Sequence, residues 1–480
     1  MITTKEKNLD TQEIRFKDEK SVNYLRFNCI STSPKMHDLA LTLAERCRLS
    51  RGAERQVHKD FAPAFNVVLT SLEVSGAYKA NQWIRIVTDN EVYGGKTQRS
   101  AAHNRLVLTV LKWLIANAYL LKIDGKRVVK YSGSSQVNDL PFAYVISDKW
   151  RNEIADCPIS AQHDITRNPL AAYVQLRKRI STSKKSKGRS VSIAITQVDR
   201  RNYSDLIGGT EILLTAVDEI WQSTRISLDD LVLPAMQTTM TRIFNNGSFD
   251  EGGRFYCQLQ NLPKNQRKRL FFNGEPTIEI DFSGMHPHLL YHLQRDDFSG
   301  DPYRIEGFDR DVVKVAFNTL INRDSSKYKE PPGRSLARNL NMTIEEGTTL
   351  ESAIYRLHYR IAGRFNTGYG LKLQKVDSQI AYKVMMYFFT EIKKPLLMIH
   401  DSAIVSVRDV ETLKLCMVDA YRAAMINAFK GDDYLNEEKV PFPKGLVVKS
   451  MDFTNELTDT IFRALEGINI SDDQWTKAIQ

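Results

Sequence analysis

The sequence TIEIDFSGMHPHLLYHL, residues 277–293, joins a strand-like segment to a histidine-rich one. Ile278 and Ile280 alternate with Glu279 and Asp281, which predicts a strand with one apolar and one acidic face. A carboxylate at the end of a buried strand costs free energy unless a compensating group lies nearby. Asp281 therefore either caps a turn or holds a metal ion over a phosphate.

A second carboxylate lies further along, in KPLLMIHDSAIVSV, residues 394–407. His400-Asp401 stands between two apolar runs, where a hairpin commonly carries Asn-Gly. Asp281 and Asp401 can therefore meet on adjacent strands of one sheet. Two such carboxylates would bind two Mg²⁺ ions, with Mn²⁺ as the alternative, which would activate a 3′-hydroxyl and stabilise a leaving pyrophosphate.

The segment RDVVKVAFNTLIN, residues 310–322, predicts an amphipathic helix. Its polar residues recur at every fourth position and share one face, namely Arg310, Lys314, Asn318 and Asn322. The apolar residues are expected to pack inward, namely Val312, Val313, Ala316, Phe317 and Leu320. Arginine and lysine one turn apart suit a triphosphate, and a surface helix with a solvated basic edge is the alternative.

The composition is that of a soluble globular chain of two or three domains, because 42% of its 480 residues are hydrophobic and 26% are charged. The net charge of +10 favours a polyanionic partner. Lys112 and Asn117 interrupt the apolar stretch 106–121, which argues against a membrane span, and the N-terminus lacks the apolar core of a signal peptide. The five cysteines form no CxxC pair, so we expect a reducing cytoplasm and no structural zinc site.

Residues 100–131 predict a helix followed by a β-hairpin. Apolar residues recur at helical spacing from Leu106 to Leu114, and Asp124-Gly125 joins two β-prone runs. This order resembles the winged helix-turn-helix fold, whose helix enters the major groove of DNA, although winged helices also serve as protein–protein modules. We assign residues 1–150 to such a domain. Its predicted nucleic-acid-binding cations are Lys96, Arg99, Arg105 and Lys126.

The segment RKRISTSKKSKGRS, residues 177–190, holds seven Lys or Arg residues and no acid. It predicts either a solvated flexible linker or a segment that neutralises nucleic-acid phosphates. We assign residues 151–240 to this basic linker and a helical, thumb-like region.

Together these segments resemble the palm and fingers of family A DNA polymerases and the related single-subunit RNA polymerases of phages and mitochondria. DFSGMHPHLLYHL resembles their first palm motif, RDVVKVAFNTLIN their fingers helix and MIHDSAIV their second metal motif. Asp250-x-x-Gly253-Arg254 resembles the D-x-x-G-R motif of the RNA polymerases. The segment LQNLPKNQRKRLF resembles a stretch that grips template and primer, and VDSQIA resembles the helix before the second metal motif. The resemblance covers residues 240–455 and implies an α/β right-hand polymerase core in residues 241–480.

The resemblance implies a role for each matching residue. Asp281 and Asp401 would bind the metal ions, and Lys314 would act with them in catalysis. The implied nucleotide-binding residues are Arg310, Lys314, Asn318, Asn322 and His286. The implied nucleic-acid-binding residues are Arg254, Lys264, Arg267, Gln379 and His400, and Glu279 has a supporting role.

The chain departs from the family where the sugar is selected. His286 replaces a glutamate that excludes the ribose 2′-hydroxyl in DNA polymerases, Asn322 replaces the fingers tyrosine, and Asn318 replaces an aromatic residue. His286 either blocks a 2′-hydroxyl by its bulk or accepts a hydrogen bond from it, so the choice between dNTP and NTP stays open. His286 and His288 show no metal-ligand spacing with another histidine or cysteine, and their alternative role is packing.

These features predict a template-directed nucleotidyltransferase, in the first place a DNA-directed DNA polymerase of a phage, plasmid or integrated mobile element. The first alternative is an RNA polymerase or primase on the same site, and the second is a DNA-binding replication initiator or regulator with a degenerate core. A two-metal nuclease or transposase would not need the helix 310–322. The expected partners are template and primer DNA, nucleoside triphosphates and other replication proteins, with no membrane.

Overall fold

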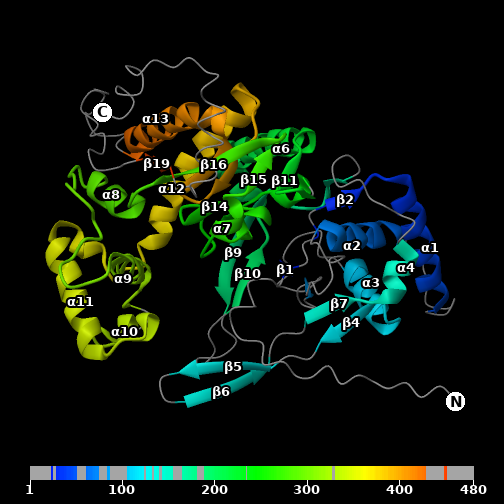
Figure 1. Ribbon diagram of the computed structural model, residues 1–480, viewed down its shortest axis with the longest axis horizontal. Coiled ribbons are helices and arrows are strands. Elements are labelled where there is room, and N and C mark those ends of the chain that lie inside the picture. Colours follow the sequence, from blue (N-terminus) through cyan, green and yellow to red (C-terminus); the bar gives the residue numbers. More distant parts are fainter. Residues whose placement is uncertain are drawn as a thin grey trace. The chain divides into compact units, whose positions relative to one another are not determined.

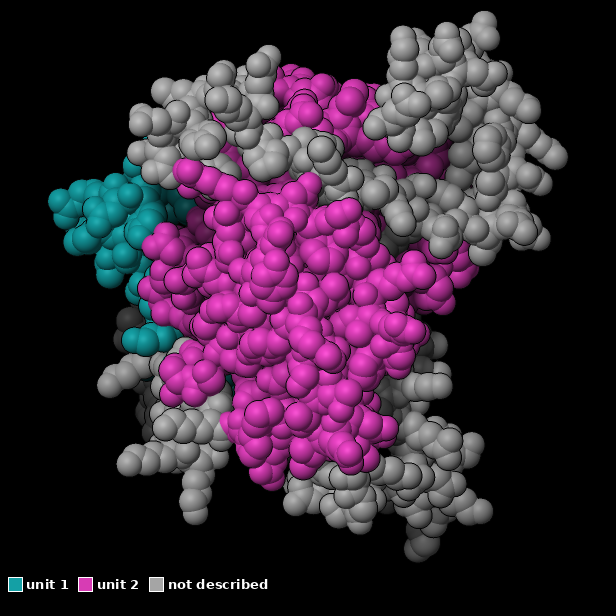
Figure 2. Space-filling model, turned by 90° about the vertical axis from the view of Figure 1, so that its left-hand side faces the viewer, with its two compact units in different colours: residues 1–211, 234–241 teal, residues 212–233, 242–480 magenta. Residues whose placement is uncertain are grey.

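The computed structural model describes two compact units of the chain (Figure 2). Unit 1 comprises residues 1–211 and 234–241, and unit 2 comprises residues 212–233 and 242–480. None of the helices described is both long and apolar enough to cross a membrane. The domain boundaries at residues 150 and 240 stay predictions. The residues described are 23–24, 27, 29–50, 61–74, 84–86, 105–123, 126–131, 134–139, 143–154, 165–180, 189–233, 235–326, 330–428 and 448–450.

Unit 1 contains a helical core beside a small sheet. The predicted helix is confirmed as α3 (Arg105–Ala116), with Val107, Val110, Leu111 and Leu114 buried. Its apolar face packs in one core with residues of α1 (Pro34–Ser50) and α2 (Ala62–Val74). The sheet has the strand order β1 (Asn23–Tyr24), β3 (Ile84–Arg85), β7 (Ala143–Ile146) and β4 (Leu120–Ile123).

The predicted hairpin across Asp124-Gly125 is wrong. Strand β4 pairs antiparallel with β7, whereas β5 (Lys126–Tyr131) pairs with β6 (Ser134–Asp139). The β4–β7 register sets Leu120 opposite Ile146, and both side chains are buried in the core, so long-range burial overrides the local turn signal. Of the predicted DNA-contacting cations, Arg105 is exposed at the start of α3 and Lys126 begins β5. Lys96 and Arg99 lie outside the described residues.

The basic segment 177–190 begins and ends in paired strands rather than in a linker. β9 (Val174–Ile180) and β10 (Arg189–Ile193) pair antiparallel, with Ile180 opposite Arg189. The residues between these strands lie outside the described part. The chain continues into two helices, α5 (Gln197–Asn202) and α6 (Ser204–Ser223), of which α5 begins at a capping box formed by Thr196 and Asp199.

Unit 2 is built on an antiparallel sheet in which β16 (Glu275–Phe282) is central. Asn273 and Gly274 both have positive φ values, 53° and 83°, and form the two-residue turn that leads into β16. Helices α12 (Gly370–Met386) and α13 (Val410–Ala428) lie beside this sheet (Figure 1). The strand order is β12 (Leu231–Leu233), β11 (Ile226–Leu228), β15 (Leu270–Phe272), β16, β18 (Ser402–Ser406) and β17 (Leu397–Ile399), and β19 (Val448–Ser450) also pairs with β16.

A helical group in unit 2 contains the predicted fingers helix, α9 (Arg310–Asn322), together with α10 (Arg334–Leu340) and α11 (Ile344–Leu357) (Figure 1). Helix α9 begins at Asp309, whose carboxylate accepts from the backbone N–H groups of Asp311 and Val312. The predicted inward face is confirmed, because Val313, Ala316, Phe317 and Leu320 are fully buried. Val312 is only half-buried, so it lies at the edge of that face.

Candidate active site

Asp281 lies near the end of β16, and Asp401 lies just before the neighbouring strand β18. Strands β16 and β18 pair antiparallel with Asp281 opposite Ser402, and the backbone N–H of Phe282 donates to the carbonyl of Asp401 at 3.4 Å. Asp401 follows His400 in the tight turn between β17 and β18. His400 takes the left-handed conformation with a φ of 58°, which a two-residue hairpin turn requires.

Nearby cations do not fully balance the negative charge of the two carboxylates. Burial, and then the charge of Asp401, raise the pKa of Asp281 to about 7, while Lys314 and Lys264 oppose the rise. The Oδ1 atom of Asp281 is buried and has no hydrogen-bond partner within the described residues. A divalent cation with oxygen ligands would compensate a buried acceptor that lies beside a second carboxylate. These residues therefore fit Mg²⁺ or Mn²⁺.

Lys314 is the residue of α9 whose charge acts on Asp281. Its side chain is exposed and forms no hydrogen bond or ion pair with the part of the chain that the structure describes. Arg310 differs, because its Nε donates to Asp301 at 2.6 Å. Lys314 is therefore available to a ligand, whereas Arg310 would first have to leave Asp301.

Of the two asparagines on the predicted nucleotide-binding face, Asn322 bonds within the helix itself. The side-chain amide of Asn322 donates to the carbonyl of Asn318 at 2.8 Å. A Cβ atom on Gly370, at the start of α12, would lie 2.0 Å from Oδ1 of Asn322. Asn322 thus packs on the backbone of α12, and glycine at position 370 allows that close approach.

His286 is held by a buried ion pair between Arg254 and Asp377. Arg254 Nε lies 3.1 Å from both carboxylate oxygens of Asp377, and the side chains are only 15% and 1% exposed. His286 Nε2 lies 2.8 Å from Oδ2 of Asp377. Asp377 can only accept, whereas Arg254 Nη2, 3.3 Å from the same nitrogen, can only donate. The shorter contact favours a proton on Nε2, which leaves Nδ1 of a neutral His286 as an acceptor.

This arrangement corrects the role predicted for Arg254, and it shows a residue that the sequence analysis missed. Arg254 was predicted to bind nucleic-acid backbone, but the structure places its guanidinium on Asp377, inside unit 2. Asp377 lies in α12 two residues before Gln379, the predicted amide of this helix, which is exposed. The sequence holds one signal for Asp377, because an acid on the buried face of a helix requires a partner.

Arg267 also differs from its predicted role. Its Nε and one terminal nitrogen donate to Glu279 at 3.0 and 2.8 Å, and the other terminal nitrogen donates to the carbonyl of Leu262. Ser402 donates to the same carboxylate at 2.8 Å. Arg267 and Ser402 therefore meet on Glu279, which links β16 to β18, and the supporting role of Glu279 at the metal site stays a prediction.

Two further predicted residues stay near the carboxylates. Lys264 is exposed at the start of α7 (Lys264–Arg267), and its charge reaches Asp281. The ring of His400 meets that of Tyr256 edge to face at 5.5 Å. Burial, followed by the charge of Arg254, lowers the pKa of His400, so a neutral imidazole stands beside Asp401.

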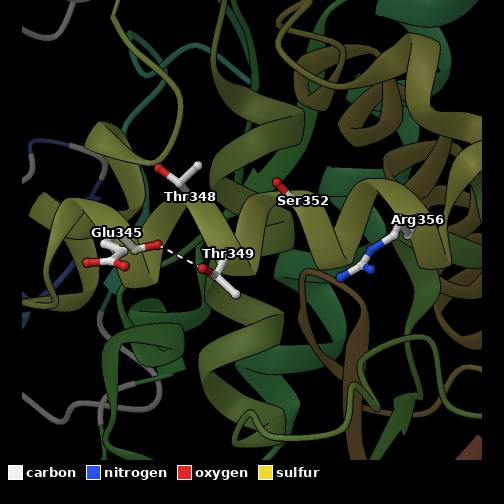
Figure 3. A pocket seen from close by; sticks show the side chains of 5 residues that line it. All are labelled: Glu345, Thr348, Thr349, Ser352 and Arg356. Carbon is white, nitrogen blue, oxygen red and sulfur yellow. Dashed lines mark hydrogen bonds between the residues drawn. The ribbon is translucent and has the colours of Figure 1, made fainter.

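A hollow in unit 2 is formed by the polar face of α11. Glu345, Thr348, Thr349, Ser352 and Arg356 line it, and all project from one helix (Figure 3). The hydroxyl of Thr349 donates to the backbone carbonyl of Glu345 at 3.0 Å. None of the residues lining it is a predicted site residue.

No protein-family model matches this chain, and no curated protein does. Among solved structures, the chain is similar to the POL domain of Pol1 from M. smegmatis in complex with DNA primer-template and dNTP. The sequence identity is 15% and the TM-score is 0.31, over 53% of this chain and 52% of that chain. The chain thus spans about half the length of that structure, and the similarity is weak.

Proposed function

We propose that the protein is a template-directed nucleotidyltransferase, in the first place a DNA-directed DNA polymerase. One observation carries the proposal: Asp281 lies near the end of β16 and Asp401 in the turn that leads into the neighbouring strand β18, Oδ1 of Asp281 is buried without a hydrogen-bond partner among the described residues, and the charge of Lys314 acts on Asp281. The residues of a two-metal nuclease would include the carboxylates but would not require the lysine of α9. The motif order of the sequence supports the same assignment.

Each residue has a physical task in this reaction. Asp281 and Asp401 would hold Mg²⁺, which supplies charge to activate a primer 3′-hydroxyl and to neutralise a leaving pyrophosphate. Lys314, exposed on α9, binds the phosphates of the incoming nucleotide. Arg310 adds a second cation when it exchanges Asp301 for phosphate oxygens.

DNA is the proposed partner of both units. In unit 1, the exposed Arg105 begins α3, and β9 and β10 carry the two ends of the basic segment 177–190. These cations suit phosphate contacts, which supply affinity without sequence preference. In unit 2, the exposed Lys264 beside the carboxylates suits the primer terminus.

Primer extension with dNTPs and NTPs in parallel tests the proposed function. We expect Mg²⁺-dependent, template-matched extension with dNTPs by the purified chain. Extension with NTPs alone would assign an RNA polymerase or primase to the same site. Cleavage of the DNA without extension would indicate a nuclease, and duplex binding without either reaction would indicate an initiator with a degenerate core.

We expect Lys314→Ala to raise the KM for the nucleotide and to lower kcat, with kcat/KM reduced by about 10²–10³-fold, because the lysine neutralises charge on the phosphates. Single-nucleotide incorporation kinetics measure both constants. Arg338→Ala is the matched control, since it removes a cation from α10 that is paired with Glu330. A Lys314→Ala enzyme that is impaired only in DNA affinity would place α9 on the template instead.

We expect His286→Ala to increase NTP use relative to dNTP use by about fivefold or more, because removal of a ring held by Asp377 opens space at the sugar. His286→Phe keeps the bulk and is expected to keep the discrimination. Competition between dNTP and NTP in one extension reaction measures the ratio. Selective loss of NTP use in His286→Ala would show instead that Nδ1 accepts a hydrogen bond from the 2′-hydroxyl.

A further inference from the structure

A second group of metal-ligating side chains lies in unit 2 apart from the two aspartates. It consists of His288 and His292 of α8 (Met285–His292) and Asp297, and one ligand atom from each lies within 4.8 Å of the others. The two histidines are four residues apart on one helix, so their side chains lie one turn from each other. We predicted no metal-ligand spacing for His288, and the structure brings it together with His292 and an acid that lies beyond the helix.

His288 is the member that ordinary packing does not explain. Its side chain is fully buried, and neither ring nitrogen has a hydrogen-bond partner among the described residues. An imidazole without partners in the interior costs free energy, because at least one nitrogen donates and the other accepts. His358 is the internal comparison, since it is equally buried but bonds Tyr291 at 3.1 Å and the carbonyl of Pro302 at 2.8 Å.

The other two members are already placed as ligands of one ion would be. His292 Nε2 lies 3.1 Å from Oδ1 of Asp297, and two ligands of a tetrahedral zinc ion lie about 3.3 Å apart. The opposite nitrogen of His292, Nδ1, is hydrogen-bonded to the hydroxyl of Tyr421 at 2.7 Å. Such a partner fixes the orientation of the ring, as is usual for a histidine that binds a metal, and with a metal on Nε2 the Nδ1–H would donate to the tyrosine hydroxyl.

We propose that His288, His292 and Asp297 bind a structural Zn²⁺ ion. Two imidazoles and one carboxylate suit zinc better than Mg²⁺, which prefers oxygen ligands alone. The side chain of Asp297 is 32% exposed, so the ion enters on that side and a water molecule completes the coordination. Tyr421, from α13, is the positioning residue for His292.

The ion would hold the element that carries His286. Gly284, with a φ of 67°, lies between β16 and α8, so the helix begins four residues beyond Asp281 and contains His286 in its first turn. Zinc ties the last turn of α8 to Asp297 and, through Tyr421, to α13. This inference does not depend on the proposed function, because it concerns a separate set of ligands.

The test is the metal content of the full chain, purified and then dialysed in the presence of excess Mg²⁺, which occupies the carboxylate site. We expect about one zinc ion per chain and, after replacement by Co²⁺, the intense visible absorption of a tetrahedral site. Asp401→Asn is expected to keep the zinc. A wild-type chain that binds no zinc and shows no Co²⁺ absorption would overturn the proposal, as would loss of the zinc in Asp401→Asn.

Matched variants locate the ion. We expect His288→Gln and Asp297→Asn to lose it, whereas His358→Gln and Asp296→Asn keep it, because Asp296 is paired with Arg360. Tyr421→Phe removes only a hydroxyl, and we expect zinc affinity to fall about 10–100-fold. Circular dichroism checks that each variant is folded. If His288→Gln does not fold, the partly exposed Asp297 still permits the test, and retention of full zinc affinity by Asp297→Asn would refute the site.

Discussion

Replacement of Asp401 or Asp281 by asparagine is expected to reduce nucleotide addition by about 10³-fold or more, which corresponds to about 4 kcal/mol of transition-state stabilisation. The buried Oδ1 of Asp281 has no hydrogen-bond partner in the part of the chain that the structure describes, and Asp401 raises the pKa of Asp281. The pair therefore depends on a cation, which one carboxylate and one neutral amide would no longer hold. Single-turnover primer extension at saturating Mg²⁺ measures the loss. Affinity for primer–template DNA is expected to stay or to rise, because a negative charge near the phosphates is removed.

Asp419→Asn is the matched control for this prediction. It removes the same charge from α13, where the side chain is 77% exposed. We expect this variant to extend primers at the wild-type rate. Near-normal extension by Asp401→Asn would show that the carboxylate pair is not the catalytic centre, and equal loss in the control would point to a general effect of charge.

Replacement of Asp377 by alanine is expected to lower the free energy of unfolding by about 3–5 kcal/mol, the second large effect. Arg254 is then left buried without its carboxylate, and His286 loses the acceptor for its Nε2 proton. Denaturant-induced unfolding, followed by tryptophan fluorescence, measures the change. Because the ring of His286 is released, the ratio of NTP to dNTP use is expected to change as well.

A double variant separates the broken pair from the lost side chain. Arg254→Met combined with Asp377→Leu removes both charges, and we expect it to recover most of the lost stability because no buried charge is left alone. Glu330→Ala breaks an exposed pair with Arg338 and is expected to cost at most about 1 kcal/mol. If Asp377→Ala costs no more than Glu330→Ala, the ion pair does not hold the buried network.

The predictions that rested on the periodicity of apolar residues agree with the structure. The alternation of Ile278 and Ile280 with two acids gave a strand, and the spacing of residues 310–322 gave a helix with the expected buried face. The turn at Asp124-Gly125 failed, because strand β4 pairs with β7, which lies further along the chain. Which strands pair depends on the side chains that both strands can bury, and the sequence of a turn does not determine this.

The cations of the candidate site show the same limit of prediction from local sequence. A run of Lys and Arg residues upstream of Asp281 suggested a surface that grips nucleic acid, yet Arg254 and Arg267 form buried pairs with Asp377 and Glu279. Lys264 and Lys314 stay exposed, as a ligand-binding role requires. The difference comes from acids elsewhere in the chain, which only folding brings within reach.

The amino-acid sequence alone determined the strand of Asp281, the turn of Asp401 and the helix of Lys314, because periodicity and turn chemistry act over a few neighbouring residues. Tertiary structure alone decided that the strand of Asp281 pairs with the strand that follows Asp401, that Asp377 holds His286, and that Asp297 meets His288 and His292. Charged and ligating groups act at separations of a few ångströms. The sequence shows which of these groups the chain contains. The packing of elements that are distant in the chain sets the distances between them.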